Sequence, residues 1–259
     1  MIFRLDGSIE ETLALTPAMK EWKEATSDLV WADTLYPELF VGNPYVDGVI
    51  NEKVKGHCVT DFNNVSWQSS IRPVSDSFSE FLMGKRKRQS WRTIMKHSVE
   101  QEDVAMGIIG GRSNVVVVSE GMDVGVDDVL AKNGWSVVRM SGKKGLLGVY
   151  QAVVSMACLY IGVDGDDTAI ALTTDTPAVV AYTCRNPVYF SPFRRGIPFE
   201  AIVPDKNICE VFDSCLSVNG LFENGKTYGV KCPKKEISCK EWVTVECVVK
   251  AVARLLEKA

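Results

Sequence analysis

The sequence predicts an α/β protein built from parallel sheets. Its 259 residues are 46% hydrophobic and 24% charged, which is typical of a globular protein. Short β-like runs alternate with helical patterns along the whole chain, the arrangement expected of repeated βα units. The run 115–118 is four valines, as expected of a parallel strand buried on both faces. At this length the chain allows one large domain or two small ones.

The first part of the chain predicts a strand, a helix and two further strands. Residues 2–5 form a short apolar run, and residues 10–23 carry apolar positions at a helical period. Pro17 lies inside that pattern, so it should kink the helix or mark its real start. Strand character returns at 29–31 and, after a turn, at 46–50.

The middle of the chain predicts a boundary between two domains. The pattern is weak over 51–79. A helical pattern at 91–99 is followed by polar residues and by glycines within 107–111, a composition typical of a linker. We therefore expect two domains, residues 1–112 and 113–259.

The second half of the chain shows the clearer alternation of strands and helices. The last predicted helix has apolar residues on one face, so it should cover a sheet. The predicted strands are 115–118, 135–140, 158–163 and 178–182, and the predicted helices are 127–132, 146–156, 168–174 and 241–258.

Charge argues against a nucleic-acid binder whose whole surface is basic, because the formal net charge is −4. One dense basic run, Lys85 to Arg88, is either a solvated loop or a contact for an anionic acceptor, such as a phosphorylated lipopolysaccharide core or a nucleic acid.

The start of the chain becomes charged before an apolar segment can form, so no secretory signal is predicted and a cytoplasmic location is expected. The apolar stretch 149–163 is too short to span a bilayer. In that location the eight cysteines are expected to be reduced. The chain has only two histidines, His57 and His97, which argues against a histidine-rich metal site and weakens the case for a Ser/His/Asp triad.

Two stretches of the first half resemble glycosyltransferase family 9, the ADP-heptose:lipopolysaccharide heptosyltransferases. Residues 4–6 and 9–19 read RLD and IEETLALTPAM, similar to the family's R-L-D-x-I-G-D-x-L-L-T-T-P-A-L with one residue inserted after Asp6. Residues 42–50 read GNPYVDGVI, similar to its G-N-P-x-V-D-x-V-I.

The second half resembles the donor-site block of the same family. The motif G-K-T-S-L has a counterpart in Gly142, Lys143 and Lys144, and residues 161–177 align with V-S-x-D-[ST]-G-x-x-H-L-x-x-A-L-x-x-P. Cys232 and Cys239 resemble the cysteine segment ahead of the family's last helix. The match covers both ends of the chain and most of residues 113–259.

The resemblance implies a GT-B-like fold, in which two Rossmann-like domains with parallel sheets face a cleft. It implies an inverting transfer of a sugar from a nucleotide-sugar donor, ADP-heptose in the family, to a hydroxyl of a glycan or lipopolysaccharide, with no cofactor or metal required. Such a protein would be cytoplasmic, or peripheral at the inner membrane.

Inverting transfer needs a general base for the acceptor hydroxyl. The family's base is the Asp of I-G-D, and the alignment places Glu11 at that position and Glu10 at the preceding glycine. The alternative is that both acids stabilise the start of the helix through its dipole.

The resemblance implies a donor site formed by Asp164, Gly165, Asp166 and Thr168, with Lys143 and Lys144 as phosphate contacts. Asp166 replaces a glycine of the family and Ala169 replaces its histidine. The added acids should repel a diphosphate unless a cation or a basic side chain intervenes. Three arginines are further candidates for that role because guanidinium groups bind phosphate bidentately: Arg185, Arg194 and Arg195.

Several alternatives stay open on the sequence. The chain is either an active transferase, a relative that lost catalysis and serves as a binding or assembly module, or an unrelated nucleotide binder. DNA, protein or another glycan are alternative acceptors. The spacing of four cysteines is looser than that of usual zinc sites, so a metal site is the less favoured interpretation for Cys209, Cys215, Cys232 and Cys239.

Overall fold

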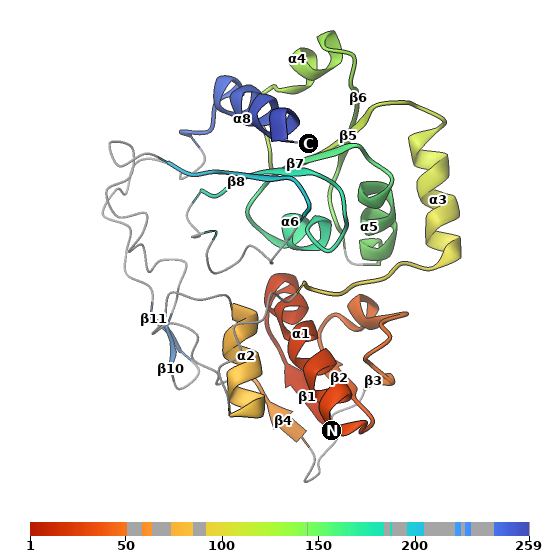
Figure 1. Cartoon of the computed structure of the whole chain (residues 1–259), viewed down its shortest axis with the longest axis vertical. Coiled ribbons are helices and arrows are strands. Elements are labelled where there is room, and N and C mark those ends of the chain that lie inside the picture. The colour runs from red at the N-terminus through yellow and green to blue at the C-terminus, as the bar shows by residue number, and fades with distance from the viewer. Residues whose placement is uncertain are drawn as a thin grey trace.

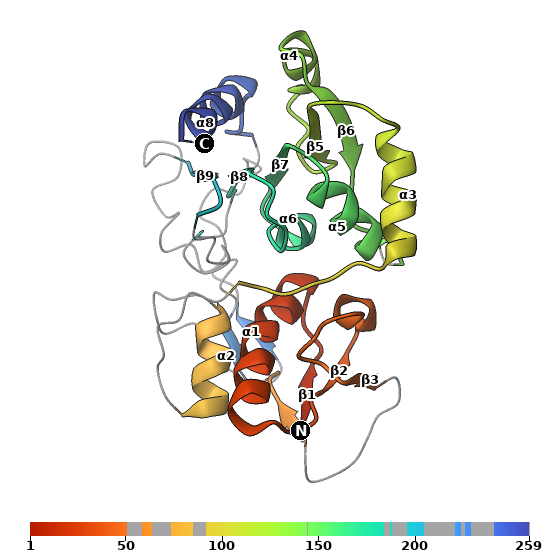
Figure 2. The same cartoon turned by 45° about the vertical axis from the view of Figure 1, so that its right-hand side comes forward.

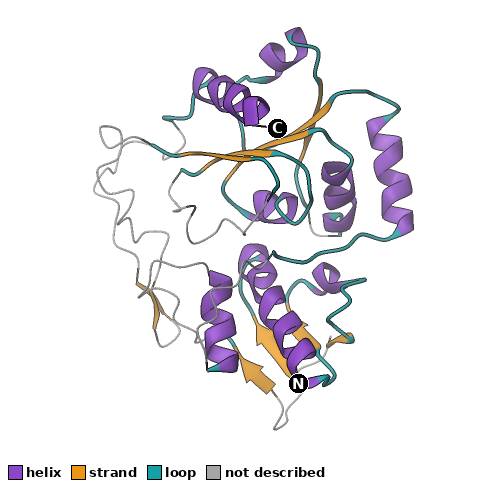
Figure 3. Ribbon diagram, in the orientation of Figure 1, coloured by secondary structure: helices purple, strands orange, loops and turns teal. Residues whose placement is uncertain are grey.

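A computed structural model shows two lobes, each with a parallel sheet and flanking helices (Figures 1 and 3). The connection between the lobes runs through residues 92–98. The structure describes residues 1–50, 59–63, 74–84, 92–143, 145–183, 187, 196–204, 221–223, 226–228 and 241–258.

The first lobe has a four-stranded parallel sheet in the order β3-β2-β1-β4, with helix α1 packed against helix α2. Residues buried in it include Phe3, Leu5 and Phe62, and Phe3 stacks on Phe62 at 5.5 Å. Its elements are β1 (Ile2–Leu5), α1 (Ile9–Thr26), β2 (Trp31–Thr34), the 3-10 helix η1 (Pro37–Phe40), β3 (Gly48–Ile50), β4 (Val59–Asp61) and α2 (Val74–Met83).

The second lobe has a five-stranded parallel sheet in the order β6-β5-β7-β8-β9. Apart from it lies the antiparallel pair β10 (Leu221–Glu223) and β11 (Lys226–Tyr228). The lobe's other elements are α3 (Val99–Ile109), β5 (Val115–Ser119), α4 (Asp127–Lys132), β6 (Ser136–Met140), α5 (Leu147–Ser155), β7 (Leu159–Val163), α6 (Asp166–Ala171), β8 (Ala178–Ala181), β9 (Phe199–Ile202) and α8 (Val245–Lys258).

The central strands of the second sheet are buried on both faces because helices cover each side. Along β5 the side chains alternate: Val115 and Val117 pack in the core on the α5 side, and Val116 and Val118 pack with α8. Helix α8 contributes a single apolar stripe, as its sequence pattern predicts. The prediction of parallel sheets with helices on their faces is confirmed.

Several local predictions need correction. The helix predicted at 91–99 is wrong, because residues 92–98 form no helix and α3 begins at Val99. Helix α1 runs through Pro17, so the alternative that this proline marks its start is wrong. Helix α6 begins two residues before its predicted start at 168.

Elements of the described chain that were not predicted include η1, α2, α3, β9, β10 and β11. Helix α3 packs against α5 and so lies with the second lobe, while the proposed domain limits, 1–112 and 113–259, remain a prediction. Within the part of the chain that the structure describes, no helix is long and apolar enough to cross a membrane.

Candidate functional site

The two segments that carry the sequence motifs meet where the lobes touch. Helix α1 follows β1 of the first sheet, and α6 follows β7 of the second, so each helix starts at the carboxyl edge of its parallel sheet. The starts of these helices face one another (Figures 1 and 2), and the backbone N–H of Glu10 donates to Oδ1 of Asp166 at 3.2 Å. Residues 156 positions apart are thereby in contact. We call this contact region the seam.

Glu11, the predicted base, closes a capping box at the start of α1. Its backbone N–H donates to Oγ of Ser8 at 3.2 Å, and its Oε2 accepts from the N–H of Ser8 at 2.8 Å. The side chain is half-buried. One carboxylate oxygen is thus engaged in capping, and a carboxylate has further lone pairs with which to accept a proton. The neighbouring Glu10 is 93% buried, with a relative exposure of 7%.

Asp164 and Gly165 form the turn that leads from β7 into α6. Oδ1 of Asp164 accepts from both the N–H and the hydroxyl of Thr183, at 2.9 and 2.8 Å. That carboxylate therefore ties the turn to the end of β8. Gly165 has φ 147° and ψ −170°, a conformation that is essentially restricted to glycine.

Asp166 and Asp167 reach out from the first turn of α6 in two directions. Oδ1 of Asp166 accepts from Glu10 in the other lobe, whereas Oδ1 of Asp167 accepts from the N–H of Gly142 at 2.7 Å within its own lobe. Burial raises the pKa of both carboxyls. The charges of Asp166 and Glu120 raise the pKa of Asp167 further, and the Gly142 N–H opposes that shift. The acids thus place negative charge beside the predicted donor turn.

Thr168 is buried and its hydroxyl belongs to an internal chain of hydrogen bonds. Oγ1 donates to the carbonyl of Val163 at 2.5 Å, so its single proton is used there. The hydroxyl of Tyr160 therefore donates to Thr168, at 2.9 Å, and that of Tyr150 donates to Tyr160, at 3.4 Å. Burial raises the pKa of Tyr160 to about 12. The chain of hydroxyls fixes the start of α6 from behind, and sequence reasoning missed it.

The basic residues predicted for the donor site are described only in part. Lys143 lies in the loop after β6 and its side chain is exposed to solvent. No group of three or more His, Cys, Asp or Glu side chains that could hold a metal ion occurs among the described residues. Predicted residues outside the described parts of the chain are Lys144, Arg185, Arg194, Arg195, the run Lys85 to Arg88, His57, Cys209, Cys215, Cys232 and Cys239.

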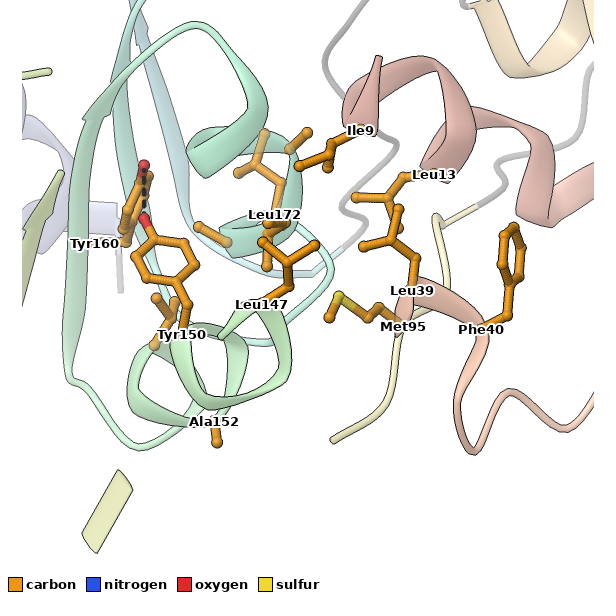
Figure 4. Packing of buried hydrophobic residues seen from close by; sticks show 14 of the residues in the cluster. Ile9, Leu13, Leu39, Phe40, Met95, Leu147, Tyr150, Ala152, Tyr160 and Leu172 are labelled. Carbon is orange, nitrogen blue, oxygen red and sulfur yellow. Dashed lines mark hydrogen bonds between the residues drawn. The ribbon is translucent and has the colours of Figure 1, made fainter. Parts of the chain in front are cut away.

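Beside these polar contacts the seam is apolar. Ile9, Leu13 and Leu39 from the first lobe lie opposite Leu147 and Leu172 from the second, all within one continuous buried cluster (Figure 4). Each is 5% exposed or less. Truncation of a buried leucine to alanine typically costs about 2–5 kcal/mol, so this packing holds the lobes together strongly.

The connecting segment 92–98 is hydrogen-bonded to both lobes. The N–H of Ile94 donates to Oγ1 of Thr16 in α1 at 2.9 Å. Nε2 of Gln151 in α5 donates to the carbonyl of Met95 at 2.8 Å, and this glutamine is only 3% exposed. These contacts explain why the segment is extended although its own pattern suggests a helix.

Solved glycosyltransferases share this fold. A glycosyl transferase family 9 protein from Veillonella parvula has a TM-score of 0.69 at 13% identity, over 100% of this chain and 97% of that one. The ADP-heptose lipopolysaccharide heptosyltransferase II of E. coli has a TM-score of 0.63 at 10% identity, over 100% and 99%. The heptosyltransferase TibC of enterotoxigenic E. coli, solved in complex with ADP-D-β-D-heptose, has a TM-score of 0.64 at 11% identity, over 99% and 77%.

At identities this low the likeness establishes the fold and confirms the predicted GT-B-like α/β architecture. No protein-family model and no curated protein matches the sequence.

Proposed function

We propose that the chain is an inverting glycosyltransferase that moves a sugar from a nucleotide-sugar to a hydroxyl of an acceptor. The observation that carries the proposal is the contact between the start of α1, which holds Glu11, and the turn 164–168, at the seam of a GT-B-like fold. Inverting transfer brings a general base and a donor together at one place, and these are the two segments that the family resemblance assigns to those roles.

In this proposal Glu11 takes the proton of the acceptor hydroxyl as the hydroxyl oxygen bonds to the anomeric carbon of the donor sugar. The bond from that carbon to the diphosphate breaks at the same time, and the nucleoside diphosphate leaves. The turn 164–168 holds the donor, and Lys143 with the predicted Lys144 offsets part of the diphosphate charge. Asp166 and Asp167 oppose that charge, so a divalent cation at the diphosphate would favour binding.

The family resemblance and the neighbours suggest ADP-heptose as donor and a lipopolysaccharide or lipid-linked glycan as acceptor. Such an enzyme would work in the cytoplasm, or peripherally at the inner membrane. The altered donor turn leaves DNA, protein or another glycan as the alternative acceptors.

A second candidate function is a binding or assembly module without catalysis. A specific observation favours it: Glu11 caps its own helix, Asp164 is bonded to Thr183, and Asp166 and Asp167 are bonded to backbone amides. Each of these four acids thus makes a hydrogen bond that stabilises the fold without any substrate.

The variant Glu11→Gln separates the two candidates, because glutamine at this position preserves the capping box but cannot act as a base. Sugar release from ADP-heptose and other nucleotide-sugars would be measured with and without Mg²⁺ and with a lipopolysaccharide-core acceptor. For a transferase we expect Glu11→Gln to lose at least about 100-fold in rate. Glu24→Gln, which removes an exposed charge at the far end of α1, is the control.

Thermal stabilisation of the wild type by the same ligands gives an answer that does not depend on the acceptor. A ligand at 100 times its dissociation constant adds about 2.7 kcal/mol to the free energy of unfolding. No turnover and no stabilisation by any nucleotide-sugar would overturn the transferase proposal and favour the non-catalytic module.

A further inference from the structure

Asp166 belongs to the second lobe, yet its carboxylate is bonded to the first. Its Oδ1 accepts the Glu10 N–H, which lies in the first turn of the 18-residue helix α1. The N–H groups of a first turn have no acceptor within their own helix. Ser8 supplies an acceptor for Glu11, whereas Glu10 is bonded to the opposite lobe. The positive end of the helix dipole adds to the attraction for a carboxylate.

The position of this bond matters because it crosses the space beside the predicted donor turn. The separation between the Asp166 oxygen and the Glu10 nitrogen is 3.2 Å, which leaves no room for another group between them. Other contacts between the described parts of the lobes include the apolar packing around Leu13 and Leu147 and the hydrogen bonds of segment 92–98. These can persist when the Asp166 bond breaks, so the bond can open locally.

We propose that Asp166 is a latch between the lobes, and that its bond to the start of α1 must open before a nucleotide-sugar diphosphate can occupy the donor turn. This inference rests on the proposed function. The latch makes the unliganded protein resist anionic ligands in two ways: the carboxylate fills the space at the seam, and its charge repels phosphate.

Asp167 provides a matched control for Asp166. It is the adjacent residue, carries the same charge and also accepts a backbone N–H, but its partner Gly142 lies in the same lobe. The variants Asp166→Ala and Asp167→Ala therefore remove equal charge from the donor turn, and only the first removes a bond between the lobes.

Hydrogen exchange of the Glu10 amide, resolved by NMR, reports the latch without any ligand. We expect exchange to rise about tenfold in Asp166→Ala and to stay near the wild-type rate in Asp167→Ala. Asp166→Asn keeps an oxygen acceptor, so its exchange should stay within about twofold of the wild type. An unchanged Glu10 amide in Asp166→Ala, or an equal rise in Asp167→Ala, would refute the latch.

Calorimetric titration with ADP and Mg²⁺ then tests the gating role. Both variants should bind ADP more tightly than the wild type because they lose a negative charge, and Asp166→Ala should exceed Asp167→Ala by at least about threefold. Equal affinities overturn the gating role. The Glu10 amide can exchange as expected while ADP and ADP-heptose bind to neither the wild type nor the two alanine variants. That result would confirm the bond between the lobes but refute both the gating role and the proposed function.

Discussion

The starts of α1 and α6 face each other at the seam but are built in different ways. At α1, Ser8 and Glu11 bond to each other's backbone, so residues within four positions cap the helix end, apart from the Glu10 N–H, which is bonded to Asp166. At α6, the N-cap is Gly165, which has no side chain and makes no side-chain cap. Its geometry comes instead from the glycine backbone and from Thr168, which is bonded to β7 behind it.

The difference separates a helix start encoded locally from one held by the tertiary structure. A capping box folds with its own helix, whereas the turn before α6 is held only when β7 and α5 are in place. Asp166 and Asp167 do not cap their own helix. Their carboxylates accept hydrogen bonds from the backbone N–H groups of Glu10 and Gly142 instead. Four substitutions test this contrast.

Thr168→Val should have the largest effect, with a loss of about 3 kcal/mol in the free energy of unfolding. The change preserves shape but leaves the buried Tyr160 hydroxyl without its acceptor and removes a donor to Val163. Urea unfolding measures it. Thr26→Val is the control and should cost less than about 0.5 kcal/mol, because the Thr26 hydroxyl, which donates to the Trp22 carbonyl and accepts from the Asp28 N–H, is exposed to water. Equal losses would show that α6 does not depend on the hydroxyl chain.

Gly165→Ala should cost about 2 kcal/mol, because alanine is strained at φ 147°. Apart from the two neighbours of Gly165 in the chain, no atom of the described residues lies within 4 Å of the added methyl group, so the loss would arise from the backbone. Gly107 in α3 has no positive φ, and outside its own helix turn a methyl group there meets no atom of the described residues within 4 Å. Gly107→Ala should therefore stabilise the protein slightly. Thermal unfolding of both variants distinguishes backbone strain from crowding; a neutral Gly165→Ala would contradict the special geometry of this turn.

Ser8→Ala should cost about 1 kcal/mol, the typical value for loss of an N-cap. Helix α3 offers a matched capping box, Ser98 with Gln101, that lies away from the seam. Ser98→Ala is therefore expected to cost the same if α1 is capped only locally. A larger loss for Ser8→Ala in chemical denaturation would mean that the lobe contact through Glu10 depends on the cap, and the contrast between the two helix starts would be weaker than proposed.

The sequence predicted much of the fold because its strongest signals are local. Four consecutive valines can hardly form anything but a buried strand in an α/β chain, and β5 is that strand. The apolar stripe of α8 likewise specifies a helix on a sheet. At the site, the motifs predicted that Glu11 and the turn 164–168 matter together, and the structure brings their segments into contact.

What the sequence could not predict depends on partners far along the chain. Residues 92–98 have a helical pattern, but Thr16 and Gln151 hold their backbone extended. The chain of hydroxyls from Tyr150 to Thr168 leaves no periodic signal, because it joins two helices, α5 and α6, to strand β7. Two aspartates in succession signal unusual chemistry, but not which amide each carboxylate accepts.

Asp167→Asn should have the smallest effect on stability, and its sign depends on pH. The folded protein raises the pKa of this carboxyl above its ordinary value of 3.8, chiefly through burial. The stability linked to the protonated carboxyl is fully present below about pH 3.8 and is lost as the pH rises through the folded pKa. At pH 7 the ionised carboxylate therefore lowers the free energy of unfolding.

Asparagine is uncharged, so it removes this destabilisation, and its side-chain oxygen can still accept a hydrogen bond from the Gly142 N–H. We expect Asp167→Asn to raise the Tm at pH 7, and the gain to disappear toward pH 3.8, in thermal unfolding measured across this range. Asp128→Asn, at an exposed acid in the first turn of α4, should give no gain at either pH. A gain for Asp167→Asn that persists at low pH would mean that packing rather than charge is responsible, and that the partly buried acids of α6 carry no electrostatic cost.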